Sequence, residues 1–134
     1  APDRTGDTLV DLVQREHGRV YPVHRLDEET TGALVLARTP EAREFLEEIF
    51  RTRKSERIYL ALVSRVPTPP SGRIEARLKL GDDGVVRADP KGEVAITTYR
   101  TLGRRAGGAL VACRLQTGRR NQIRVHFSEL CSKL

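Results

Sequence analysis

A single aspartate, Asp27, lies in the stretch HRLDEETTGALVLA (residues 24–37), after His24 and Arg25 and ahead of a Thr-Thr-Gly turn. A carboxylate beside an arginine stays ionised, which suits a nucleophile better than a general acid. The alternative is structural, with Asp27 capping the turn at residues 30–32. The local sequence leaves both interpretations open.

Tyr59 lies in a second stretch of interest, ERIYLALV (residues 56–63), close to Lys54 and Arg57. An aromatic ring among cations can stack on a nucleobase, as it does in proteins that read single-stranded RNA. The alternative is a core or edge tyrosine with its hydroxyl in water.

A third stretch, QTGRRNQIRVH (residues 116–126), is rich in arginine. If it is extended, Gln122, Arg124 and His126 fall on one face of the strand, opposite Ile123. A guanidinium on that face could pair with a carboxylate or a phosphate. The alternative is a solvated, basic edge strand.

Around these residues, hydrophobic patterning predicts an α+β fold in one domain over residues 1–134. We expect a mixed, largely antiparallel sheet with two or three flanking helices. Helices are expected over residues 5–16 and 40–52, the second capped by Thr39 with Pro40 at its first position. Strands are expected over residues 33–38 (buried on both faces), 56–65, 72–81, 93–105 and 109–118, the last two joined around Gly107 and Gly108. Residues 119–131 are expected to begin extended and to turn helical after Val125.

The composition favours an anionic partner, with nucleic acid first. Lysine and arginine number 24 against 18 aspartates and glutamates, a net charge of +6. The chain has two cysteines, Cys113 and Cys131, and we expect both to be free thiols in a reducing cytosol. A cytoplasmic location is therefore expected. No Cys/His cluster has the spacing of a zinc site, and no apolar run approaches the roughly 20 residues that span a membrane.

Four motifs in one order resemble those of the RluA-type pseudouridine synthases. HRLDEETTGALVLA is similar to H-R-L-D-x-x-T-S-G-x-x-x-x-A, and ERIYLALV resembles K-x-Y-x-A-L-V. GEVAITTYRTL (residues 92–102) resembles G-K-x-A-x-T-x-Y-x-V-L, and TGRRNQIRVH resembles T-G-R-x-H-Q-I-R-V-H. The motifs extend from about residue 23 to residue 126 and so cover most of the chain.

The resemblance implies an isomerase that converts uridine in ribosomal or transfer RNA to pseudouridine without a metal or an organic cofactor. It implies that Asp27 is the catalytic aspartate, that Tyr59 stacks on the target base and that Arg124 pairs with the aspartate. The residues it implies for RNA or base binding are Arg25, which helps to displace the base, Ile123 at the floor of the site, and His24, Arg119 and Gln122.

The sequence departs from the family pattern in two ways that matter. Asn121 stands where the family has His, and the Gly-Asp-x-x-Tyr-Gly stretch expected after RVH is absent. We therefore expect a catalytic-domain fragment without its C-terminal part, with an uncovered sheet edge through which copies could dimerise. Two alternatives are an RNA-binding remnant without turnover and an unrelated basic α+β module for phosphate-rich ligands. A glycosidase is disfavoured because that chemistry usually needs two placed carboxylates.

Overall fold

The computed structural model describes residues 7–52 and 54–132 of the chain. They fall into two compact units, Ala1–Ser55 and Glu56–Leu134, and each unit is described by itself. Within the described residues, no helix is long and apolar enough to cross a membrane.

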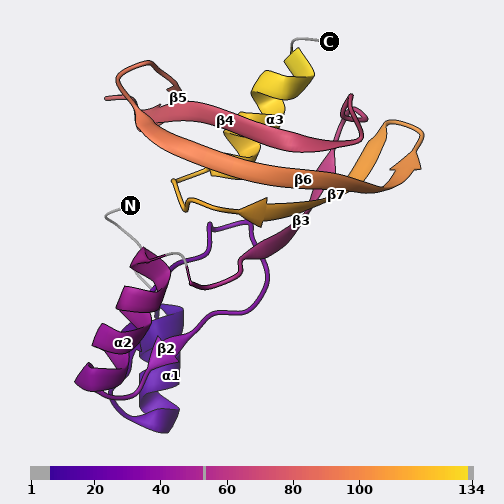
Figure 1. The fold of residues 1–134 in the computed structure, drawn as a ribbon. Coiled ribbons are helices and arrows are strands. Elements are labelled where there is room, and N and C mark those ends of the chain that lie inside the picture. Colours follow the sequence, from indigo (N-terminus) through magenta and orange to yellow (C-terminus); the bar gives the residue numbers. More distant parts are fainter. Residues whose placement is uncertain (1–6, 53, 133–134) are drawn as a thin grey trace. The chain divides into compact units, whose positions relative to one another are not determined.

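The first unit holds two helices and a two-stranded ribbon (Figure 1). Its elements are α1 (Leu9–His17), β1 (Tyr21–Pro22), β2 (Leu36–Ala37) and α2 (Pro40–Arg51), with β1 and β2 antiparallel. A capping box starts α1: the hydroxyl of Thr8 accepts from the backbone N–H of Asp11 at 3.2 Å, and the Asp11 carboxylate accepts from the N–H of Thr8 at 2.9 Å. The first helix therefore begins at Leu9, and residues 5 and 6 of its predicted range lie outside the described residues.

Helix α2 confirms its prediction, since the hydroxyl of Thr39 accepts from the N–H of Ala42 at 3.1 Å and Pro40 opens the helix. The strand predicted over residues 33–38 is wrong in extent and burial. Only Leu36–Ala37 is a strand, and Val35 is 41% exposed. An apolar run alone does not place a strand in the middle of a sheet, and here the partner strand has only two residues.

The second unit is a five-stranded sheet in which every pair of neighbouring strands is antiparallel. Its strands are β3 (Ile58–Val63), β4 (Ser71–Leu80), β5 (Val86–Ala88), β6 (Glu93–Arg105) and β7 (Gly108–Leu115), in the order β3-β7-β6-β4-β5. The predicted α+β class, the largely antiparallel sheet and the hairpin around Gly107 and Gly108 are confirmed. Strand β5 was not predicted, because it is short and lies between two turns.

Helix α3 (Gln122–Ser132) packs on one face of this sheet (Figure 1). Phe127 of α3 meets Tyr99 of β6 edge to face, with ring centroids 5.4 Å apart. The buried cluster beneath the helix consists of Tyr99, Ala109, Val111, Cys113 and Phe127. The prediction that residues 119–125 are extended is wrong, since the helix already begins at Gln122.

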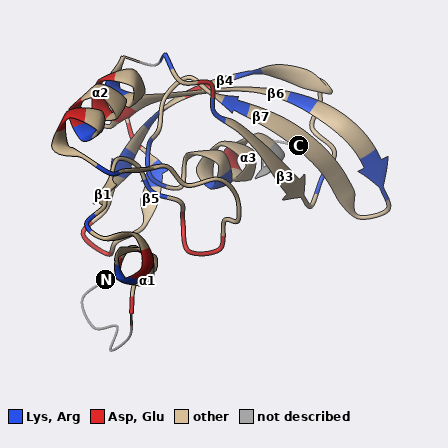
Figure 2. Cartoon of the chain, turned by 90° about the horizontal axis from the view of Figure 1, so that it is seen from below, with Lys and Arg blue, Asp and Glu red and all other residues tan. Residues whose placement is uncertain are grey.

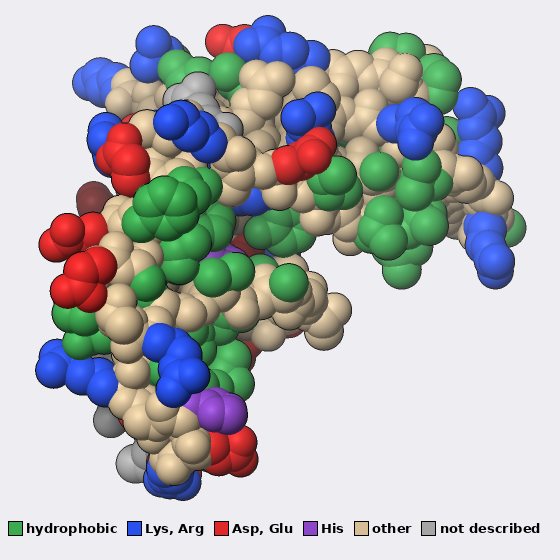
Figure 3. Space-filling model, turned by 60° about the horizontal axis from the view of Figure 1, so that its bottom comes forward, with side chains coloured by type: hydrophobic (Ala, Val, Ile, Leu, Met, Phe, Trp, Pro, Cys, Tyr) green, Lys and Arg blue, Asp and Glu red, His purple; other side chains and the backbone are tan. Residues whose placement is uncertain are grey.

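Strand β3 forms one edge of the sheet, and its two faces differ. Tyr59, Ala61 and Val63 pack toward the buried cluster, whereas the intervening apolar side chains are exposed. The exposed fractions are 61% for Ile58, 67% for Leu60 and 87% for Leu62. Hydrophobic side chains are correspondingly visible at the surface in the space-filling view (Figure 3).

Candidate active site

The first unit positions His24, Arg25 and Asp27 in the segment between β1 and β2. The Nε2 atom of His24 accepts from the backbone N–H of Val35 at 2.9 Å, and its ring lies against Phe50 with centroids 4.8 Å apart. The carbonyl of Asp27 accepts from the N–H of Thr30 at 2.9 Å, which closes a turn. His24 thus holds two parts of the segment together, and Asp27 opens a tight turn with its side chain half-buried.

In the second unit, Tyr59 and Ile123 are brought to the same cluster although 64 positions separate them in the sequence. Tyr59 lies on β3 opposite Cys113 of β7, and Ile123 lies in the first turn of α3. Both side chains are partly buried against the cluster that contains Cys113 and Phe127. Burial raises the pKa of the Cys113 thiol to about 11, so this thiol stays protonated and contributes only packing.

A buried polar network fixes the start of α3. The Oε1 atom of Gln122 accepts from the hydroxyl of Thr117 at 2.7 Å and from the N–H of Arg119 at 3.0 Å. Its Nε2 atom donates to the carbonyl of Ile96 at 3.0 Å and to the hydroxyl of Thr97 at 2.9 Å. The amide of Gln122 therefore ties the helix to β6 and to the turn after β7.

His126, one turn further along α3, extends this network. Its Nδ1 atom lies 2.9 Å from the hydroxyl of Thr97, and the residue is completely buried. Burial lowers the pKa of His126 below its ordinary value of 6.5, so the ring is neutral at physiological pH. Its Nε2 atom has no hydrogen-bond partner among the described residues.

The network places Arg124 on an exposed part of α3, between the buried residues Gln122 and His126. Its Nη1 atom lies 3.5 Å from the side-chain oxygen of Asn121. Asn121 has a φ of 53°, in the left-handed region that asparagine tolerates better than most residues. The asparagine that replaces the family's histidine therefore suits the turn that precedes α3.

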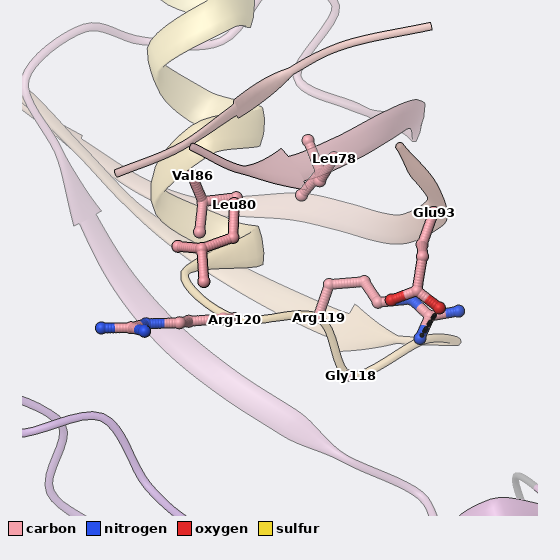
Figure 4. Close-up of a pocket in the computed structure, with 7 residues that line it drawn as sticks. All are labelled: Leu78, Leu80, Val86, Glu93, Gly118, Arg119 and Arg120. Carbon is pink, nitrogen blue, oxygen red and sulfur yellow. Dashed lines mark ion pairs between the residues drawn. The ribbon is translucent and has the colours of Figure 1, made fainter. Parts of the chain in front are cut away.

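Two expected RNA-binding residues are committed to contacts within the protein. Gln122 is 2% exposed and all four of its hydrogen bonds are internal, which favours a structural role over the predicted RNA contact. Arg119 donates to the carbonyl of Val94 at 3.2 Å and pairs with Glu93 at 3.0 Å (Figure 4). Beside this pair lies a pocket of about 200 Å³, lined by Leu78, Leu80, Val86, Glu93, Gly118, Arg119 and Arg120.

The positive charge of the chain is concentrated in one segment. Residues 94–128 contain seven arginines and no aspartate or glutamate, whereas the whole chain carries +6, so the remaining residues carry −1. Figure 2 shows basic residues on the strands and at the end of β6, while α2 carries both signs. A basic sheet unit of this kind suits a phosphate-rich partner.

The described arrangement unites part of the predicted site. Tyr59 and Ile123 share a cluster, and Arg124 follows Ile123 on the same helix. Asp27 belongs to the first unit, so its approach to Tyr59 and Arg124 stays a prediction. The second unit by itself offers an aromatic ring, Tyr59, and a guanidinium, Arg124. Among the described residues, no three His, Cys, Asp or Glu side chains gather as metal ligands would.

The sequence analysis named Arg57 only as a cation near Tyr59 and gave it no role in the site. Arg57 is half-buried, and the alternation of β3 places it on the same face as Tyr59. Its Nε atom is buried without a hydrogen-bond partner among the described residues. The signal in the sequence was its place two residues before Tyr59, where the family has a lysine.

Comparison with known proteins points to one family. The model of the family described as RNA pseudouridylate synthase matches residues 5–129. The chain is 35% identical over 128 residues to the mitochondrial pseudouridylate synthase RPUSD4 of Xenopus tropicalis, covering 78% of this chain and 40% of that protein. It is 41% identical over 114 residues to the chloroplastic RNA pseudouridine synthase 2 of Arabidopsis thaliana, covering 78% of this chain and 26% of that protein.

Solved structures agree with the sequence comparison. The structure of human RNA pseudouridylate synthase domain containing 4 superimposes with a TM-score of 0.75 at 33% identity, covering 90% of this chain and 52% of that one. The structure of human RNA pseudouridylate synthase domain containing 1 superimposes with a TM-score of 0.82 at 23% identity, covering 92% of this chain and 56% of that one. This second match shows a similarity of fold. The chain thus spans about half or less of the length of the proteins it matches.

Proposed function

The chain belongs to the RNA pseudouridylate synthase family, and from that premise we propose that it isomerises uridine to pseudouridine in RNA. The observation that carries this proposal is the family match over residues 5–129, a range that includes Asp27, Tyr59 and Arg124. The half-buried Tyr59 and the exposed Arg124 of the second unit support it further.

The reaction needs no redox step and no transfer to a second molecule. The bond between ribose C1′ and uracil N1 breaks, the base turns over, and a bond forms between C1′ and C5. The proton on C5 is lost and N1 gains one. Since the atoms of the substrate balance those of the product, a nucleophile and a closed pocket are sufficient in principle.

In this proposal Asp27 supplies the nucleophilic or basic carboxylate, acting on the base or on the ribose. The uridine must first leave its stack, which costs a few kcal/mol. Stacking on Tyr59, worth about 1–3 kcal/mol per base, and insertion of Arg25 offset that cost. Arg124 pairs with the carboxylate and keeps it ionised and aimed.

The test is release of tritium from RNA labelled at uracil C5, comparing the wild-type chain with Asp27→Asn. We expect the wild type to release tritium and Asp27→Asn to release none while its RNA affinity stays within about twofold. Pseudouridine formation by Asp27→Asn would overturn the assignment of Asp27. RNA binding by the wild type without tritium release would favour the alternative of a non-catalytic RNA-binding remnant.

Three narrower statements belong to the same proposal. The substrate is ribosomal or transfer RNA, which pseudouridine mapping in total RNA with and without the gene would identify. A cytoplasmic location is supported by the free thiol of Cys113, although the similar proteins include mitochondrial and chloroplastic ones. Dimerisation through the β3 edge is supported by the exposed Leu60 and Leu62 and is tested by sedimentation.

A further inference from the structure

We propose that Arg57 binds a phosphate of the RNA strand next to the nucleotide whose base stacks on Tyr59. This inference rests on the proposed function, because it takes RNA as the ligand and Tyr59 as the stacking ring. It adds a binding residue that the motif comparison did not assign. The evidence is the burial, contacts and position of a single guanidinium.

The first argument is that Arg57 has no charged partner among the residues that the structure describes. Its guanidinium makes no ion pair or hydrogen bond with any residue that the structure describes, and its Nε atom is shielded from solvent. Four other arginines of this unit are each paired with a carboxylate: Arg73 with Glu75, Arg87 with Asp83, Arg114 with Glu56 and Arg119 with Glu93. A half-buried guanidinium without a partner is unfavourable, and a bound anion would relieve that cost.

The second argument is that the guanidinium occupies space that the chain leaves open beside Gly118. A Cβ atom added to Gly118 would lie 2.3 Å from Nη1 and 3.3 Å from Cζ of Arg57. The absence of a side chain at residue 118 therefore makes the room that the guanidinium occupies. The carbonyl of Arg57 accepts from the N–H of Leu115 at 2.9 Å, which fixes the backbone beside β7.

The third argument is the position of Arg57 relative to Tyr59. Residues 57, 59, 61 and 63 alternate with exposed ones, so Arg57 and Tyr59 share a face of β3. Two residues along an antiparallel strand span about 7 Å. A single nucleotide can bridge that distance between its base and its phosphate. Arginine suits the role because its planar guanidinium can donate two parallel hydrogen bonds to phosphate oxygens.

The test measures binding of the full chain to a short fluorescein-labelled single-stranded RNA with one uridine, over a series of salt concentrations. Arg57→Gln should weaken binding about tenfold or more and reduce the salt slope by about 0.7, the value for one phosphate on a single strand. Arg57→Lys keeps the positive charge but loses the planar guanidinium that can donate two parallel hydrogen bonds. This variant should therefore keep the salt slope of RNA binding and lose part of the affinity. The matched control is Arg73→Gln, which removes an exposed, paired arginine.

Gly118→Ala provides a second variant with Arg57 unchanged. Its Cβ meets the far end of a flexible side chain, so the guanidinium can move aside and the fold is kept. We expect Gly118→Ala to weaken binding as Arg57→Gln does, and the double variant to be no weaker. Equal thermal midpoints would show that each variant is folded.

Replacing the RNA phosphates one at a time by neutral methylphosphonates locates the contact. One position should weaken wild-type binding and leave Arg57→Gln unaffected. An unchanged salt slope in Arg57→Gln, or equal sensitivity of both proteins at every position, would overturn the proposal. Failure of the wild type to release tritium would instead count against the proposed function, because these binding measurements do not depend on turnover.

Discussion

Gln122→Met is the substitution that most directly tests the account of how α3 is anchored. Methionine matches the length of glutamine but removes both polar atoms of the amide. The carbonyl of Ile96 keeps its bond from the N–H of Gln116 at 3.1 Å, and the Thr97 hydroxyl keeps its contact with His126. The hydroxyl of Thr117 and the N–H of Arg119 lose the acceptor they share.

Leaving a buried donor unsatisfied costs about 1–3 kcal/mol, so the buried hydroxyl of Thr117 and the part-buried N–H of Arg119 together predict a loss of about 2–4 kcal/mol in the free energy of unfolding. Urea unfolding followed by circular dichroism should show a lower midpoint with an unchanged m-value. Gln116→Met, on an exposed side chain, is the control and should change stability by less than about 0.5 kcal/mol. A loss below about 1 kcal/mol for Gln122→Met would show that the network does not anchor the helix.

Two further predictions concern burial and close packing. Because burial lowers the pKa of His126, the unfolded chain binds more protons than the folded chain as the pH falls through 6.5, and the free energy of unfolding should decrease there by up to about 1.4 kcal/mol per pH unit. Urea unfolding at a series of pH values should show that His126→Gln flattens this dependence. The same pH dependence in His126→Gln as in the wild type would contradict the prediction. Gly92→Ala should destabilise the chain by about 1–3 kcal/mol, because the new Cβ would lie 2.5 Å from the carbonyl of Leu78, a backbone group that cannot move aside. An unchanged thermal midpoint would contradict this prediction.

Features set by local chemistry could be predicted from the sequence. Thr39 and Pro40 specify the start of α2 through a cap and a fixed φ, and both act within one helical turn. The turn at Gly107 and Gly108 likewise specified the hairpin of β6 and β7.

Features set by distant partners could not. Residues 122–126 alternate in polarity as a strand would, yet Gln122 begins a helix because its amide is bonded to Ile96 and Thr97, about 25 positions earlier. Strand β5 forms because its residues pair with β4. A segment of three residues is too short for its own pattern to predict a strand.

The candidate site follows the same division. The motifs predicted Asp27, Tyr59 and Arg124 as site residues from residue type and order within short stretches of sequence. They did not indicate that the amide of Gln122 is bonded within the protein, or that Arg57 has no charged partner among the described residues. Both properties depend on which atoms lie nearby in the folded chain, and no pattern of residue types specifies that.

The clamped first turn of α3 constrains how quickly Arg124 can respond to a ligand. Since Gln122 bonds this turn to β6 and to the turn after β7, the helix backbone has little freedom to tilt or slide. Reorientation of the Arg124 head group is then a matter of rotation about its own side-chain bonds, which in exposed residues takes picoseconds to nanoseconds. Any slower adjustment accompanying capture of a substrate has to originate in other segments.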